Sequence, residues 1–221
     1  MTKNFCEYTV EDVLAATASK EPIPGGGGIA ALTAASAAAL VEMVANLTIG
    51  KEQYADVERL MKQIVVQAAT LRTRYLQGID ADGAAFSGVI TAVRLPKDTP
   101  ARKEKVQQAF KKAAQVPFEL GKDIFRILEL AEQVVQFGNA WVITDGAIAA
   151  MNARAAMRSS FYSVRINLQS ITDEEFVTAM ERSMKDIEDL RTYGKGRLDV
   201  TVGSALDLFG GTIPFTELVK L

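Results

Sequence analysis

Two aspartates with apolar neighbours are the candidates for acid–base chemistry in this chain. None of the 221 residues is a histidine, which excludes Ser-His-Asp and Cys-His nucleophile systems and most zinc sites. Proton transfer therefore falls to Asp, Glu, Lys, Tyr or water. Asp82 follows Tyr75 and Ile79 at helical spacing, which predicts a carboxyl group on an apolar seam. Burial there would suit a general acid or base, although a buried ion pair with a Lys or Arg of another helix fits the spacing equally well.

Other polar residues carry two interpretations each. Asp145 lies between the apolar segments 141–143 and 146–148, where it is either a second acid–base group or a helix N-cap, a position that Asp favours. Asn139 follows a glycine and is either a turn residue or a ligand contact. Lys51 follows a long apolar segment and either binds a carboxylate or satisfies the carbonyls at a helix end.

Four consecutive glycines, Gly25 to Gly28, open onto an Ala-rich segment that ends near Leu47. The first N–H groups of a helix have no partner within it, so this start predicts a bare backbone cradle for an anion or a polarised carbonyl. The alternative is a turn in which glycine lets two helices pack closely.

Composition narrows the class of protein. A hydrophobic fraction of 48% fills a real core, and a net charge of −2 provides no field for nucleic acid. The single Cys6 cannot form an internal disulfide, and the first residues lack a signal-peptide pattern, so we expect a cytoplasmic protein. The segment 29–49 approaches the length of a membrane span, but Glu42 and Asn46 interrupt it, and we expect a buried central helix rather than a membrane contact.

The elements that must position these residues are all helical. The periodicity predicts a multi-helix bundle with helices over 10–19, 28–50, 57–93, 100–137 and from 144 or 145 onward. Thr99 and Pro100 are expected to start the fourth helix, and Pro117 to kink or restart it. A Thr172–Glu175 capping box starts the sixth. We expect one helical domain over 1–191 and a Gly-rich extension over 192–221 that docks on the bundle or on a second subunit.

An ordered set of short motifs resembles the cyclodeaminase/cyclohydrolase family, which includes the C-terminal domain of formiminotransferase-cyclodeaminase. The set covers roughly residues 5–190, at the spacing that the family has. Its pieces are the glycine run 24–28, residues 43–51 with Tyr54, Asp82-x-x-x-Phe86, Leu95 to Pro100, Ala114-x-Val116-Pro117, Gly138-Asn139 with Asp145, and Val164 to Leu168.

The resemblance implies an all-helical homodimer that acts on tetrahydrofolate one-carbon units. Family members either form 5,10-methenyltetrahydrofolate from 5-formiminotetrahydrofolate with release of ammonia, which we favour slightly, or hydrolyse the methenyl compound to 10-formyltetrahydrofolate. Neither reaction needs a metal, or a cofactor beyond the tetrahydrofolate substrate, which can carry a polyglutamate tail. The resemblance implies acid–base roles for Asp82 and Asp145, and substrate binding by Gly25, Gly26, Gly27, Lys51, Asn139 and Asn167.

The chain departs from the family pattern at three positions, two of which support, together with the unmatched Gly-rich tail, an alternative from another class. Glu52 stands where a second basic residue is common, Thr144 replaces Ser, and Ser163 stands where Asn is usual. Glu52 and Ser163 favour a non-catalytic helical dimer that binds folate or a protein partner. Retention of binding without activity would separate this alternative from an enzyme.

Overall fold

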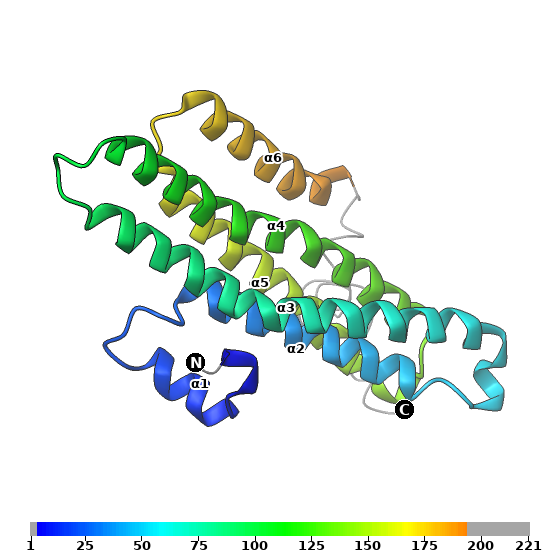
Figure 1. The fold of residues 1–221 in the computed structure, drawn as a ribbon. Coiled ribbons are helices and arrows are strands. Elements are labelled where there is room, and N and C mark those ends of the chain that lie inside the picture. Colours follow the sequence, from blue (N-terminus) through cyan, green and yellow to red (C-terminus); the bar gives the residue numbers. More distant parts are fainter. Residues whose placement is uncertain (1–3, 194–221) are drawn as a thin grey trace.

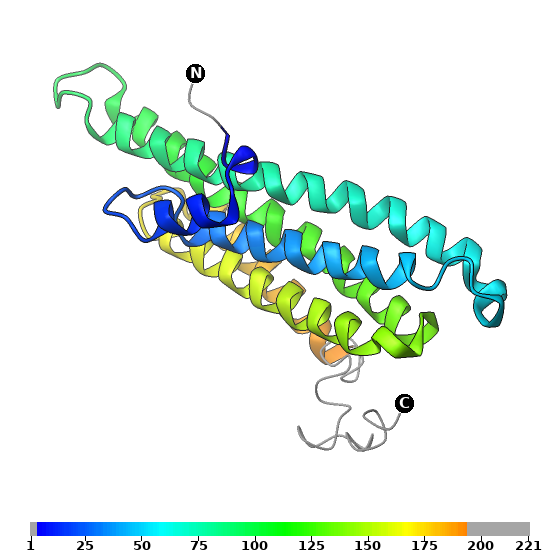
Figure 2. The same cartoon turned by 90° about the horizontal axis from the view of Figure 1, so that it is seen from below.

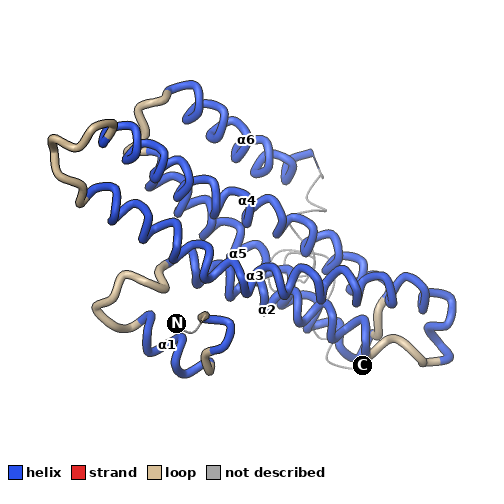
Figure 3. Tube along the Cα trace, in the orientation of Figure 1, coloured by secondary structure: helices blue, strands red, loops and turns tan. Residues whose placement is uncertain are grey.

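The computed structural model describes residues 4–193 and builds them from helices joined by short connections (Figure 1). No strand occurs in that range, so the all-α prediction is confirmed (Figure 3). The predicted extension 192–221 lies almost wholly outside the described residues. The elements are η1 (Phe5–Glu7), α1 (Val10–Thr17), α2 (Gly26–Asn46), η2 (Glu52–Val57), α3 (Glu58–Val93), α4 (Arg102–Phe137), η3 (Ala140–Val142), α5 (Ile143–Leu168) and α6 (Glu174–Tyr193).

Four long helices, α2 to α5, lie side by side, and each runs opposite to the one before it (Figures 1 and 2). The connections α2–α3 and α4–α5 therefore share one end of the bundle, while the start of α2 and the α3–α4 connection share the other. Helix α6 packs along α4, and α1 lies beside the start of α2. We name the two ends the α2-start end and the α2-finish end.

Helix α2 forms the centre of the bundle because its alanines let the other helices approach closely. Eleven of its 21 residues are buried, among them Ala34, Ala37 and Ala38. The expected burial of this central helix is not complete on all sides, because Ser36 and Ala39 are exposed. Among the described helices, α2 alone has the length and the apolar composition of a membrane span. A buried core helix has the same length and composition, and 56% of the most apolar part of α2 is buried.

Helix α3 follows the predicted seam through Met61, Ile64, Tyr75 and Ile79, which are all buried. The apolar seam leaves the core toward the end of α3, where Phe86 is 38% exposed. The seam rotates out of the core there because a long α-helix does not repeat its faces at whole-number spacing.

The start of α4 differs from its prediction. Ala101 has left-handed backbone (φ 56°), and the helix begins after it at Arg102 instead of at Thr99 and Pro100. Nε of Arg102 donates to the Leu95 carbonyl (2.8 Å), so its guanidinium satisfies the end of the preceding segment. Pro117 lies inside one uninterrupted helix.

The start of α6 also uses a different cap from the one predicted. Oδ1 of Asp173, not the hydroxyl of Thr172, accepts from the N–H of Phe176 (3.1 Å). The Thr172 hydroxyl is hydrogen-bonded to the side chain of Gln107, which lies 65 residues away in α4 (3.1 Å). The Thr172 hydroxyl therefore makes a hydrogen bond to α4 in place of the predicted cap of α6.

Candidate functional site

The carboxyl group of Asp82 lies against the first turn of α2. A Cβ added to Gly27 would be 2.6 Å from Cγ and 2.8 Å from Oδ2 of Asp82, and closer still to Oδ1. Only glycine therefore allows this approach. A Cβ on Gly26 would meet nothing within 4 Å, so the bare backbone at Gly26 faces open space. Both interpretations of the glycine run therefore hold, each at a different residue. Gly27 allows close packing, and Gly26 leaves the start of the helix accessible.

Burial raises the pKa of Asp82 above its ordinary value, and a hydrogen bond from the backbone N–H of Gly28 opposes this rise in part. Among the described residues no Lys or Arg forms an ion pair with Asp82. The alternative of a buried ion pair is therefore wrong. A carboxyl group with a raised pKa and no ion-pair partner is suited to donate or accept a proton.

Asp82 and Gly27 line a groove of about 490 Å³ between α3 and α4. Its walls are mainly apolar, with Gly78 and Ala81 on α3 and Pro117 on α4. The small residues Gly78 and Ala81 leave this part of the groove open on its α3 side.

Asp123 on α4 lines the same groove, and sequence reasoning did not identify it. Burial raises its pKa although its Oδ2 lies 2.8 Å from the guanidinium of Arg74. The backbone carbonyl of Asp123 accepts a hydrogen bond from the buried Tyr75 hydroxyl (2.9 Å), and burial raises the pKa of that hydroxyl. The position of Asp123 directly before the buried Ile124 is a weak signal that the sequence contained.

At the α2-finish end, Asn139 is buried and fixes the α4–α5 connection. Its N–H donates to the Thr48 hydroxyl (2.9 Å), and its Nδ2 donates to the Leu47 carbonyl (3.1 Å). The next residue, Ala140, donates its N–H to the Tyr54 hydroxyl (3.0 Å). Asn139 is therefore a turn residue in a network, and Thr48, with 1% exposure, is the partner that sequence reasoning missed.

Lys51 is exposed at this same end and lines a second pocket, of about 690 Å³, with Glu52, Gln53 and Trp141. Asp145 lies one turn beyond Trp141, as the third residue of α5. No side chain caps the first turn of α5, so Asp145 is not the N-cap that one interpretation of the sequence expected.

Asn167 lies near the other end of α5. Its Nδ2 donates to the carbonyls of Ala113 (3.1 Å) and Ser163 (2.7 Å), which ties α5 to α4. The side-chain amide of Asn167 is thus hydrogen-bonded within the bundle.

The candidate residues form two groups at opposite ends of one chain. Gly25, Gly26, Gly27 and Asp82 lie at the α2-start end, whereas Lys51, Asn139 and Asp145 lie at the α2-finish end. The 21 residues of α2 separate the two groups by about 30 Å. Within one chain, Asp82 and Asp145 therefore cannot act on the same small molecule.

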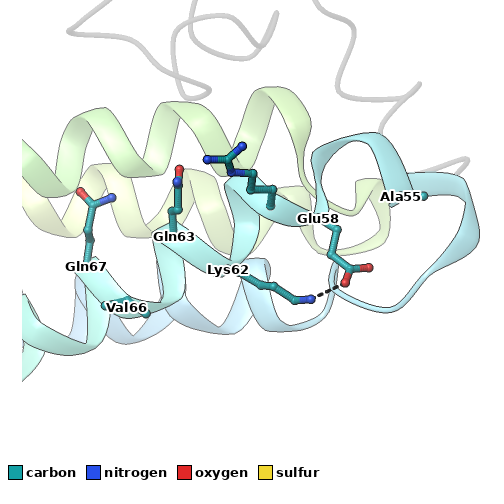
Figure 4. A pocket seen from close by; sticks show the side chains of 7 residues that line it. Ala55, Glu58, Lys62, Gln63, Val66 and Gln67 are labelled. Carbon is teal, nitrogen blue, oxygen red and sulfur yellow. Dashed lines mark hydrogen bonds and ion pairs between the residues drawn. The ribbon is translucent and has the colours of Figure 1, made fainter.

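A third hollow lies over the first turns of α3, and Figure 4 shows the side chains that line it. Lys62 and Glu58 form an exposed ion pair across it (2.5 Å). It contains none of the candidate residues. In the described part of the chain no three His, Cys, Asp or Glu residues gather as metal ligands would.

Comparison with known proteins relates the chain to one family. The formiminotransferase-cyclodeaminase family model matches residues 9–186. A methenyltetrahydrofolate cyclohydrolase of Methylorubrum extorquens is 41% identical over 187 residues, which are 82% of this chain and 88% of that protein. The formimidoyltransferase-cyclodeaminase of Rattus norvegicus is 27% identical over 84% of this chain, and the match spans 35% of that longer protein. The crystal structure of formiminotetrahydrofolate cyclodeaminase from Thermotoga maritima superposes with a TM-score of 0.80 at 29% identity, over 87% of this chain and 94% of that one.

Proposed function

This chain belongs to the formiminotransferase-cyclodeaminase family, and on that basis we propose that it is a folate-dependent one-carbon enzyme that acts at 5,10-methenyltetrahydrofolate. The observation in the structure that supports this most directly is the carboxyl group of Asp82, which has a raised pKa and no paired cation beside an open groove. We propose hydrolysis to 10-formyltetrahydrofolate as the reaction, because the cyclohydrolase relative is 41% identical. Formation of the methenyl compound from 5-formiminotetrahydrofolate is the second candidate, favoured by the likeness to the Thermotoga maritima cyclodeaminase.

Both reactions pass through a tetrahedral carbon between two nitrogens of the substrate. In hydrolysis, water adds to the methenyl carbon and loses a proton to a base. The hydroxyl of this adduct then loses its proton as the formyl carbonyl forms, and N5 leaves the carbon as it takes a proton from an acid. The products are 10-formyltetrahydrofolate and one proton. In the cyclodeaminase reaction, N10 adds to the formimino carbon, and the protonated imino nitrogen leaves as ammonia. Each path consists of addition, elimination and proton transfers with no redox step, so we propose that no cofactor is required beyond the folate itself.

Asp82 is the proposed proton donor. Its raised pKa keeps more of the acid form near neutral pH than an exposed Asp would have. In its ionised form the same group would stabilise the positive charge of the methenyl substrate. Asp145 is the proposed second carboxyl group. Gly25, Gly26, Gly27 and Lys51 are the proposed substrate-binding residues, the lysine for a carboxylate of the glutamate tail. Asn139 and Asn167, whose amides are hydrogen-bonded within the bundle, are proposed to position the segments around the site.

A homodimer is part of the proposal, and the outer face of α5 supports it. Ile148, Met151, Tyr162 and Ile166 are between 46% and 64% exposed and follow one another at helical spacing. Exposed apolar stripes of this kind are typical of helix–helix interfaces. A two-fold axis near Ala155 would pair residue 148 of one copy with residue 162 of the other.

Such an antiparallel pairing would bring the α2-finish end of one copy to the α2-start end of its partner. Asp145 and Lys51 of one copy would then lie at the end of the bundle where the second copy holds its own Asp82. Because the two groups are about 30 Å apart within one chain, we propose that each site is shared between two subunits.

The activity is tested by following the absorbance of methenyltetrahydrofolate at neutral pH. Loss of absorbance above the uncatalysed rate with methenyltetrahydrofolate would establish hydrolysis, and a gain with 5-formiminotetrahydrofolate would establish the cyclodeaminase reaction. No change in either assay, with folate binding retained, would contradict the proposal and favour a non-catalytic binding protein.

The shared site is tested by mixing two inactive variants, D82N and D145N. Random exchange makes half of the dimers mixed, and each mixed dimer has one of its two sites intact, so about a quarter of the wild-type activity returns. If mixed dimers form but remain inactive, the site is not shared in this way. D82N mixed with itself is the matched control.

A further inference from the structure

Trp141 is the only tryptophan of the chain, and it is 73% exposed. A single exposed apolar side chain is ordinary on a protein surface. Trp141 differs because it lines a pocket together with charged residues, Lys51 and Glu52, that come from a different part of the sequence.

The backbone that carries Trp141 is held firmly. Its N–H donates to Oδ1 of Asn139 (3.1 Å), and Asn139 is itself bonded to Thr48 and Leu47. The bond from Ala140 to the Tyr54 hydroxyl adds a second attachment to the segment that contains Lys51. The backbone at Trp141 is therefore held at a fixed place relative to this segment, which favours a preorganised binding surface.

The charges of the pocket define the kind of ligand. Lys51 attracts a carboxylate, Glu52 opposes it, and the amide of Gln53 can hydrogen-bond in either direction. The face of an indole stacks on flat aromatic rings. A flat ring with a carboxylate a few bonds away fits this combination.

We infer that this pocket, lined by Lys51, Glu52, Gln53 and Trp141, binds the aminobenzoyl-glutamate part of the folate, with the ring stacked on Trp141 and a carboxylate paired with Lys51. This inference rests on the proposed function. Of the two ring systems of a tetrahydrofolate, the aminobenzoyl ring is the fully aromatic one, and it lies next to the carboxylates. It is also attached to N10, beside the reacting carbon, and Asp145 lies one turn along the chain from Trp141.

The first experiment uses the emission of the single tryptophan as a report from this pocket. Titration of the wild-type protein with 4-aminobenzoyl-glutamate is expected to change the emission saturably, and 4-aminobenzamide, which has no carboxylate, to bind more weakly. K51Q is expected to raise the Kd several-fold and E52Q to lower it, since the two variants remove opposite charges. A wild-type emission that does not saturate, or a Kd that neither variant changes, would overturn the inference.

The second experiment separates substrate binding from a structural role. W141A is expected to raise KM roughly tenfold and to leave kcat within about threefold, while W141F retains most of the stacking. V66A removes a side chain that is 66% exposed in the hollow of Figure 4, and it is expected to leave both constants unchanged. If W141A leaves KM unchanged, the inference is overturned, even if the substitution alters the dimerisation constant. The proposed function still stands in that case, provided that the wild-type protein is active. A wild-type protein that turns over neither substrate, yet binds 4-aminobenzoyl-glutamate as expected, overturns the proposed reaction and supports the pocket.

Discussion

Replacement of Gly27 by Ala tests whether the close approach of Asp82 to the start of α2 matters for catalysis. The added Cβ would lie 2.6 Å from Cγ of Asp82, whereas carbon atoms in contact are normally about 3.5–4.0 Å apart. The carboxyl group must therefore move by about 1 Å, away from the N–H of Gly28. A displacement of this size at a reacting group can lower the rate about 100-fold.

G88A is the matched control for this substitution. Gly88 also lies within a helix, α3, but a Cβ there would meet nothing within 4 Å. G88A is expected to gain about 0.5–1 kcal/mol of stability and to keep wild-type activity. G27A is expected to lose about 1–3 kcal/mol through overpacking.

The assay is kcat/KM for methenyltetrahydrofolate, from the initial loss of absorbance, together with the Tm of both variants. Rates are compared at a temperature well below either Tm, so that unfolding does not contribute. If G27A and G88A have the same kcat/KM, the position of the Asp82 carboxyl group against α2 does not control the reaction, and the acid–base role assigned to it is refuted.

Three further predictions concern individual hydrogen bonds and charges. D82N is expected to lower kcat about 10²–10⁴-fold. Burial raises the pKa of Asp82 above 3.8, so the folded wild type binds this proton more tightly than the unfolded chain does. The wild type therefore loses stability as pH rises from 3.8 to the raised pKa. The Tm advantage of D82N over wild type should therefore grow across that pH range, and a constant difference would contradict the shift. Y75F removes the buried hydrogen bond to the Asp123 carbonyl (2.9 Å), so calorimetry is expected to show a loss of about 1 kcal/mol, or about 2–4 °C in Tm. T48V leaves the buried N–H of Asn139 without its acceptor, and denaturant unfolding is expected to show a loss of about 1–3 kcal/mol that T48S largely avoids.

The helices themselves were predictable because their signals are local. Apolar residues at three- and four-residue spacing marked α3 from Glu58 to Val93 to within one residue, and the same spacing placed Asp82 beside the core. The break between α3 and α4 and the turn before Asn139 were also recognised from prolines and glycine. The errors fell where a distant partner decided the outcome, as at Thr172, whose hydroxyl is hydrogen-bonded to Gln107 on α4 instead of capping α6.

The sequence alone determined that this protein is helical, that proton transfer cannot use histidine, and that glycines start its central helix. It could not determine that Asp82 lies against Gly27, or that Asp123 shares its groove, because these distances depend on how α2, α3 and α4 pack. Nor could it place Asp82 and Asp145 at opposite ends of the bundle. Periodicity specifies which face of a helix is buried, whereas the distance between residues on different helices follows from the direction and length of each helix in the assembled bundle.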